Sequence, residues 1–194
     1  MKKTFFLKFI LGLGIISITQ ISFAQQTIKV NPQKSSMTIS GTTNVHDFKS
    51  NVTQISGEMT FADKTPKTLR IEVPVKSIVS KEKLMDKKTY EAFNEPKNPK
   101  IVFVMTDVVS TQKNGNQVTA KITGNLTMAG VTKKITLSAI GKEIKAGQYE
   151  FSGSTQFKFS DYNMKAPTAM LGVMKVGEII TLKYNVTFEG SDIM

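Results

Sequence analysis

The sequence predicts an all-β protein in which about eight antiparallel strands close into a barrel, with one short helix inserted between two strands. Two observations predict this fold. After Gln26, apolar and polar residues alternate with a period of two in most segments, which is typical of half-buried strands. Short turns join these segments, so neighbouring strands are expected to pair antiparallel, and a meander of this length removes its edges by closing. A two-sheet sandwich remains the competing fold, because periodicity does not separate the two.

The first 24 residues have the organisation of a secretory signal peptide. Three early lysines precede an apolar run over residues 9–21, and Ser22-Phe23-Ala24 fits the small-x-small cleavage pattern before Gln25. An uncleaved anchor is the less favoured alternative, since a membrane span needs about 20 apolar residues. The prediction is therefore a signal peptide over residues 1–24, one domain over residues 25–194, and a periplasmic or secreted location. The chain has no cysteine, which excludes a lipoprotein and disulfides.

Nine alternating segments account for the expected strands. They cover residues 27–31, 36–41, 45–61, 67–78, 100–109, 117–128, 131–144, 148–159 and 178–188. Lys113-Asn114-Gly115-Asn116 is a strong hairpin turn. Pro74 lies within one of the segments and indicates an edge, a bulge or a missing ladder bond at that position.

Residues 80–93 form the one segment with helical spacing. Ser80 is the expected N-cap, Leu84, Met85, Ala92 and Phe93 recur at roughly helical intervals, and Asn94-Glu95-Pro96 ends the run. We expect this helix to lie on the open end or flank of the barrel as a lid or plug. The strand after it is apolar on both faces, so we also expect the helix to cover its outer side.

The charge of the chain is positive but almost wholly due to lysine. Residues 25–194 carry 23 basic and 15 acidic residues, a net charge of +8, and Arg70 is the only arginine. Sequence-specific readout of nucleic acid relies on arginine forks, so a nucleic-acid partner is not expected. A lysine-rich surface favours solubility and a transient contact with an anionic membrane.

Catalytic patterns are weak in this chain. His46 is the single histidine, which excludes histidine metal clusters and bis-histidine haem ligation within one chain. Neither a nucleophile motif nor a glycine-rich phosphate loop occurs. We therefore predict no enzymatic activity and no metal. The alternative is a hydrolase that uses His46, with Asp47 beside it, or a carboxylate pair drawn from Asp86, Glu91, Asp107 and Asp161.

Three stretches give the chain a family resemblance. Ser77-Ile78, the helix, and then residues 98–103 (NPKIVF) form the first; residues 124–133 (GNLTMAGVTK) form the second; residues 160–164 (SDYNM) with Val176-Gly177-Glu178 form the third. In order and spacing they resemble the YceI-like family of bacterial exported polyisoprenoid-binding proteins. Asn163 stands where that family has glycine, and asparagine also accepts left-handed backbone geometry.

The resemblance implies a lipocalin-like barrel without catalytic activity, whose apolar bore holds an isoprenoid or similar long-chain lipid. The lipid could be an isoprenoid quinone or a polyprenyl phosphate, and no other cofactor is expected. On this interpretation the bore is lined by the large apolar residues of the inward strand faces: Leu69, Ile71, Val73, Val75, Phe103, Leu126, Met128, Leu137, Phe151, Phe157 and Phe159. From the residues alone, the same side chains could simply pack against each other.

Two further classes of function stay open from the sequence. One is an integral outer-membrane barrel, which would turn apolar residues outward and carry aromatic girdles, whereas this chain has no tryptophan and four tyrosines. The other is the hydrolase. The sequence does not fix the lipid, its head-group contacts or the oligomeric state, a homodimer included.

Overall fold

The computed structural model describes residues 26–193, without the side chains of residues 169 and 170. The predicted signal peptide lies outside the described residues. The described part contains twelve strands, one α-helix and four short 3-10 helices. The strands are β1 (Gln26–Val30), β2 (Ser36–Thr43), β3 (Asp47–Val52), β4 (Ser56–Ala62), β5 (Thr65–Pro74), β6 (Ile78–Val79), β7 (Lys100–Asn114), β8 (Gln117–Met128), β9 (Val131–Lys145), β10 (Gln148–Lys158), β11 (Thr168–Ala169) and β12 (Met174–Gly190). The helices are η1 (Pro32–Lys34), η2 (Val75–Ser77), α1 (Lys83–Phe93), η3 (Ser160–Tyr162) and η4 (Met170–Gly172).

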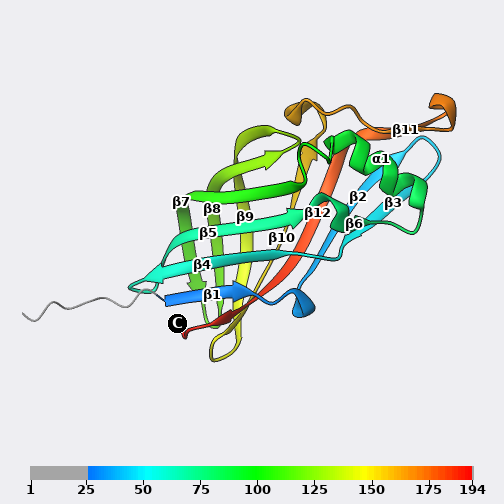
Figure 1. The fold of residues 1–194 in the computed structure, drawn as a ribbon. Coiled ribbons are helices and arrows are strands. Elements are labelled where there is room, and N and C mark those ends of the chain that lie inside the picture. Colours follow the sequence, from blue (N-terminus) through cyan, green and yellow to red (C-terminus); the bar gives the residue numbers. More distant parts are fainter. Residues whose placement is uncertain (1–25, 194) are drawn as a thin grey trace, which may run out of the picture.

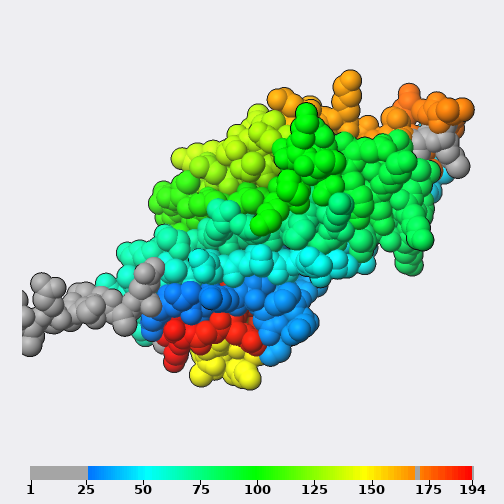
Figure 2. Space-filling view, viewed as in Figure 1, coloured from blue at the N-terminus to red at the C-terminus, as the bar shows by residue number. Residues whose placement is uncertain are grey.

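Eight of the strands close into an antiparallel barrel, as the sequence predicts. The hydrogen-bonded order is β1-β4-β5-β7-β8-β9-β10-β12, and β12 returns to β1 through the pairs Ile28–Gly190 and Val30–Phe188. At this closure β1 (blue) and the end of β12 (red) lie side by side (Figures 1 and 2). The closed ring excludes a two-sheet sandwich, because each of the eight strands pairs with a neighbour on both sides over at least part of its length.

Three short strands extend one end of the barrel. β2, β3 and β6 pair in the order β12-β2-β3-β6 and continue the directions of β1, β4 and β5 past local breaks. Pro32 opens η1 between β1 and β2, and Pro74 ends β5 before η2. The break expected at Pro74 is therefore confirmed, because proline has no N–H to donate to the ladder.

The alternation of the sequence turns apolar side chains inward. On β8, Leu126 and Met128 are buried whereas Lys121 and Asn125 are exposed. The same pattern on the other strands forms one hydrophobic core that runs along the barrel. Asn163 has a φ of 53°, so the expected left-handed geometry at this position is confirmed.

Helix α1 sits at one end of the barrel (Figure 1). It begins at Lys83 rather than next to Ser80, so the predicted N-cap was wrong: the Ser80 hydroxyl accepts the Glu82 N–H in a local turn, and the Asp86 carboxylate accepts the Ser80 N–H at 2.6 Å. The helix ends as predicted, with Asn94 in left-handed geometry at φ 49°.

The helix does not cover the outer face of β7 as the sequence suggested. It packs against β6 and η2, where the Tyr90 hydroxyl donates a hydrogen bond to the Ile78 carbonyl oxygen at 3.0 Å. Val104 and Val109, on the outer side of β7, remain 37% and 53% exposed. Phe93, at the end of the helix, is buried in the barrel core and lines the cavity, so α1 closes an end rather than a flank.

Candidate functional site

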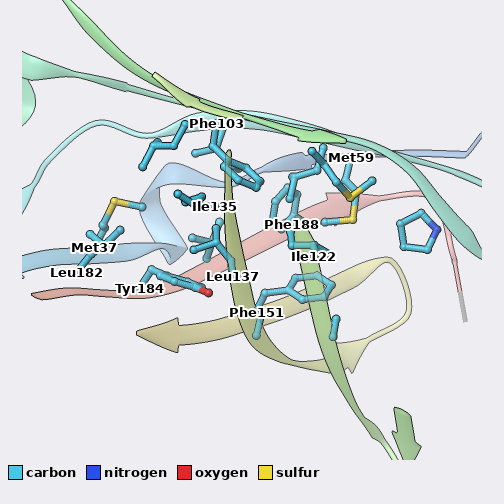
Figure 3. A pocket seen from close by; sticks show the side chains of 18 of the residues that line it. Met37, Met59, Phe103, Ile122, Ile135, Leu137, Phe151, Leu182, Tyr184 and Phe188 are labelled. Carbon is cyan, nitrogen blue, oxygen red and sulfur yellow. The ribbon is translucent and has the colours of Figure 1, made fainter. Parts of the chain in front are cut away.

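An elongated cavity of about 590 Å³ runs through the barrel. Side chains from several strands converge on it, among them Met37, Phe103, Leu137 and Tyr184 (Figure 3). The complete wall is formed by Met37, Ile39, Val52, Met59, Phe61, Lys64, Thr65, Pro66, Leu69, Ile71, Val73, Phe93, Ile101, Phe103, Met105, Val108, Thr111, Lys113, Val118, Ala120, Ile122, Leu126, Met128, Ile135, Leu137, Ala139, Phe151, Phe157, Ile180, Leu182, Tyr184, Val186, Phe188 and Ile193. The volume is in the range of small-molecule sites, which span about 300 to 1,000 Å³.

The cavity follows the length of strand β7. Wall residues occur along this strand from Ile101 to Lys113, a separation of twelve residues. At about 3.3 Å per residue this corresponds to roughly 35 to 40 Å. The shape suits an extended chain better than a compact ligand.

The wall is apolar apart from five side chains. These are Lys64, Thr65, Thr111, Lys113 and Tyr184. The Tyr184 hydroxyl donates a hydrogen bond to the Ser138 carbonyl oxygen at 3.0 Å, and burial raises the pKa of Tyr184. Tyr184 is therefore a neutral, already bonded group, and the interior offers a ligand little except hydrophobic contact.

Nine of the eleven residues predicted to line the bore lie on the cavity wall. They are Leu69, Ile71, Val73, Phe103, Leu126, Met128, Leu137, Phe151 and Phe157. The other two, Val75 and Phe159, are buried in the surrounding core at 0% and 8% exposure and are not part of the wall. Val75 lies in η2, after β5 has ended at Pro74, so it no longer follows the alternation of that strand.

Sequence reasoning missed the wall residues from β2, β12 and α1. Ile180, Leu182 and Tyr184 alternate as clearly as the residues that were chosen, so the same pattern could have found them. Phe93 could not be assigned in this way, because a helix can meet a barrel on several faces.

The distal part of β7 was missed for a structural reason. Its wall residues are spaced by two from Ile101 to Met105 and then by three, at Val108 and Thr111. Irregularities in the β7–β8 pairing fall between Met105 and Asp107 and between Val108 and Ser110. Each β-bulge adds one residue and shifts the inward phase, so the period of two is lost although the strand continues.

The two ends of the cavity differ. Phe93, which is 5% exposed, lies on the wall at the α1 end. Among the wall residues that the structure describes, the exposed ones are Lys64, Thr65, Thr111 and Lys113. They belong to the β4–β5 turn and to β7 near the β7–β8 hairpin, at the barrel end away from α1 (Figure 1). The cavity therefore reaches solvent at this end, which we call the mouth.

The residues weighed for catalysis lie outside the cavity: Asp86 and Glu91 line a second pocket on α1, and His46 belongs to neither pocket. His46 is exposed in the β2–β3 turn, and its Nδ1 lies 2.9 Å from the carbonyl oxygen of Asp47 rather than from the carboxylate. Asp86 caps the Ser80 N–H, and Glu91 pairs with Lys88 at 2.7 Å, which lowers the pKa of that carboxyl group. None of these residues lies on the cavity wall.

Two kinds of feature are absent from residues 26–193. Between residues 26 and 193, no three His, Asp or Glu side chains gather in a way that could hold a metal ion. In the same part of the chain, no helix is both long and apolar enough to cross a membrane.

A closed antiparallel barrel around one elongated apolar cavity defines a ligand-binding β-barrel, and its wall chemistry is that of a lipid-binding one. The family profile of the YceI-like domain matches residues 28–188. The chain therefore belongs to the YceI-like family, as its motifs indicate. No match was found among curated proteins.

Solved structures share the fold at low sequence identity. A polyisoprenoid binding domain from Saccharophagus degradans, implicated in plant cell wall breakdown, is similar with a TM-score of 0.69 and 11% identity, over 84% of this chain and 98% of that one. Burkholderia cenocepacia BcnA is similar with a TM-score of 0.65 and 18% identity, over 81% and 98%. A Campylobacter jejuni YceI protein has a TM-score of 0.59 and 24% identity, over 75% and 85%.

Proposed function

We propose that the protein is an exported carrier that holds one isoprenoid or similar long-chain lipid in the barrel and has no catalytic role. The observation that carries this proposal is the elongated cavity, whose wall is apolar at all but five positions. The Saccharophagus degradans domain, which is a polyisoprenoid binding domain, supports the same class of ligand. The signal peptide that the sequence predicts over residues 1–24 supports export.

The energetics favour an apolar chain over a polar ligand. Burial of apolar surface contributes about 25 cal/mol per Å², so a few hundred Å² of buried hydrocarbon contributes on the order of 10 kcal/mol before the entropy costs of binding. A polar ligand in the middle of this cavity would lose hydrogen bonds to water and regain few, because the wall there has one bonded hydroxyl group.

The outer surface favours a carrier over an integral outer-membrane barrel. The outward side chains of β5 include Arg70 and Glu72, which form an ion pair at 2.6 Å, and Lys100 of β7 pairs with Glu72 at 2.8 Å. A membrane-spanning barrel would place apolar side chains at such outward positions.

A carrier of this kind exchanges its lipid with a membrane, and we place that contact at the mouth. Exposed lysines occur on three turns or strand ends there, Lys64, Lys113 and Lys145. Lysines near an anionic bilayer surface each contribute about 1 kcal/mol. We expect this contact to be transient, because no helix between residues 26 and 193 is long and apolar enough to cross a membrane.

Binding can be tested with a matched pair of variants on β9. Leu137 lies on the cavity wall, and Ile140, on the same strand, is 49% exposed and outside the wall. In titrations of delipidated protein with a fluorescent isoprenoid, Leu137→Gln should weaken binding about tenfold or more, because the amide group is forced into the apolar bore. Ile140→Gln should bind like the parent. Equal affinities for the two variants, or no binding by the parent protein, would contradict the carrier function.

A further inference from the structure

We infer that the bound lipid carries an anionic head group, held between Lys64 and Lys113 at the mouth, with its tail directed toward α1. This inference rests on the proposed carrier function. It goes further by assigning the charge of the head group and the direction in which the lipid lies.

At the mouth, two neighbouring strands of the barrel, β5 and β7, separate from each other. β5 and β7 pair only from Arg70–Val104 to Pro74–Lys100. The first half of β5 and the distal half of β7 are not paired with each other, and β7 diverges from β5 toward the hairpin that it forms with β8 (Figure 1). The two sides of this separation carry the exposed wall residues, Lys64 and Thr65 on one side and Thr111 and Lys113 on the other.

The mouth is positively charged from both sides. Within residues 26–193, neither Lys64 nor Lys113 forms an ion pair. The nearest acidic residues in sequence are Asp63, beside Lys64, and Asp107 on β7, and neither lies on the cavity wall. An ammonium group is a strong donor to carboxylate or phosphate oxygens, and the hydroxyl group of Thr111 supplies a further donor, whereas that of Thr65 donates to the Asp63 carbonyl oxygen at 3.3 Å.

The other end of the cavity cannot accept a charged group. Its wall consists of apolar side chains such as Met37, Ile39, Val52 and Phe93. A buried charge without a partner is strongly disfavoured. A lipid with a charged head therefore fits in one direction only, with the head at the lysines and the hydrocarbon along the bore.

The ligand class that follows is a single-chain amphiphile with a carboxylate or phosphate head. An exposed ion pair contributes about 0.2 to 1 kcal/mol, which is up to about a fivefold gain in affinity for each lysine. Two lysines together predict a preference of roughly tenfold for an anionic lipid over the neutral lipid with the same chain. The preference should shrink as salt is raised, because the mouth is open to solvent.

The test uses delipidated full-length protein and two matched probe pairs. One pair is geranylgeraniol and its monophosphate, and the other is hexadecanol and palmitate. The anionic member should bind about tenfold more tightly in at least one pair. If only the phosphate is preferred the head is a phosphate, and if the carboxylate is preferred it is a fatty-acid type of head.

Lysine variants test whether Lys64 and Lys113 cause the preference for an anionic lipid. In the double variant Lys64→Gln/Lys113→Gln, the ratio of the affinities for the anionic and the neutral member of each pair should fall to about one. The control Lys121→Gln/Lys183→Gln removes the same charge from exposed lysines of β8 and β12 that lie outside the wall, and it should keep the preference.

The outcomes separate this inference from the carrier function. Equal binding of neutral and anionic probes by the parent protein would overturn the inference and leave the carrier function standing. An unchanged preference in the Lys64/Lys113 variant would also overturn it. Failure of all four probes to bind would overturn the carrier function itself and the inference with it.

Discussion

The hydroxyl group of Tyr162 is buried without a hydrogen-bond partner in the described part of the protein. The residue is 2% exposed, and its ring packs edge-on against the ring of Phe157, with 6.3 Å between the ring centroids. An unpaired buried hydroxyl group costs about 1 to 3 kcal/mol. We therefore expect Tyr162→Phe to be more stable than the parent by about 1 kcal/mol in urea unfolding at pH 7. A loss of stability of that size would mean that the hydroxyl group has a partner.

Tyr162 should also make the stability of the protein depend on pH. Burial raises the pKa of Tyr162 to about 12, whereas an unfolded tyrosine titrates near 10. The folded state therefore holds the Tyr162 proton more tightly than the unfolded state does. The resulting contribution to the free energy of unfolding is intact below about pH 10 and is lost as pH rises toward 12. Urea unfolding from pH 9 to 12 should show a smaller loss of stability for Tyr162→Phe than for the parent. Equal losses of stability in the two proteins would contradict a raised pKa of Tyr162.

Gly141 on β9 leaves room for the ring of Phe151 on β10. The two residues are directly paired, and a Cβ atom at Gly141 would lie 2.6 Å from Cε1 of Phe151. We expect Gly141→Ala to displace this wall residue, to cost about 1 to 3 kcal/mol of stability and to lower the lipid capacity. Adding Phe151→Leu should restore much of the stability in thermal unfolding. If Phe151→Leu does not restore stability, the new methyl group at position 141 does not clash with the Phe151 ring.

Helix α1 acts on the cavity through its last residue. Phe93 closes one end of the bore, whereas Leu84, in the first turn of the same helix, is 52% exposed. We expect Phe93→Ala to cost about 3 kcal/mol and to speed lipid release in stopped-flow dilution, because that end is opened. Leu84→Ala should match the parent in both measurements. Unchanged release from Phe93→Ala would show that lipid leaves only through the mouth.

Strand β7 could be predicted from the sequence only in part. The sequence predicted a strand over residues 100–109 that is apolar on both faces, with Phe103 as its one residue on the bore. The strand continues to Asn114, because two bulges let the strand change phase and keep Val108 and Thr111 on the wall. A bulge is set by pairing with β8, so the sequence of β7 alone does not reveal it.

For the molecule as a whole, the barrel could be predicted because period-two segments and tight turns are local features. The interruptions near Pro32 and Pro74 were also visible in the sequence. The separation of β5 from β7 at the mouth was not, since it depends on how far two strands remain paired in three dimensions. The lysines of the mouth, Lys64 and Lys113, were consequently read as part of a solvated surface.

The position of the mouth predicts how the protein meets a membrane. In sedimentation with anionic vesicles, Lys64→Gln/Lys113→Gln/Lys145→Gln should weaken binding at least tenfold, because about 1 kcal/mol is lost with each lysine. Leu171→Asp is the control, since Leu171 is the most exposed large apolar side chain described and lies in η4, outside the wall. A stronger effect of Leu171→Asp than of the lysine variant would contradict a contact through the mouth.

Native mass spectrometry of the protein purified from its own host is the decisive test of whether the barrel carries a lipid. We expect a complex of one chain with one long-chain lipid, which organic solvent removes and which returns when the lipid is added back. A bare protein mass, together with no uptake of any isoprenoid or fatty-acid probe by the refolded barrel, would contradict this expectation.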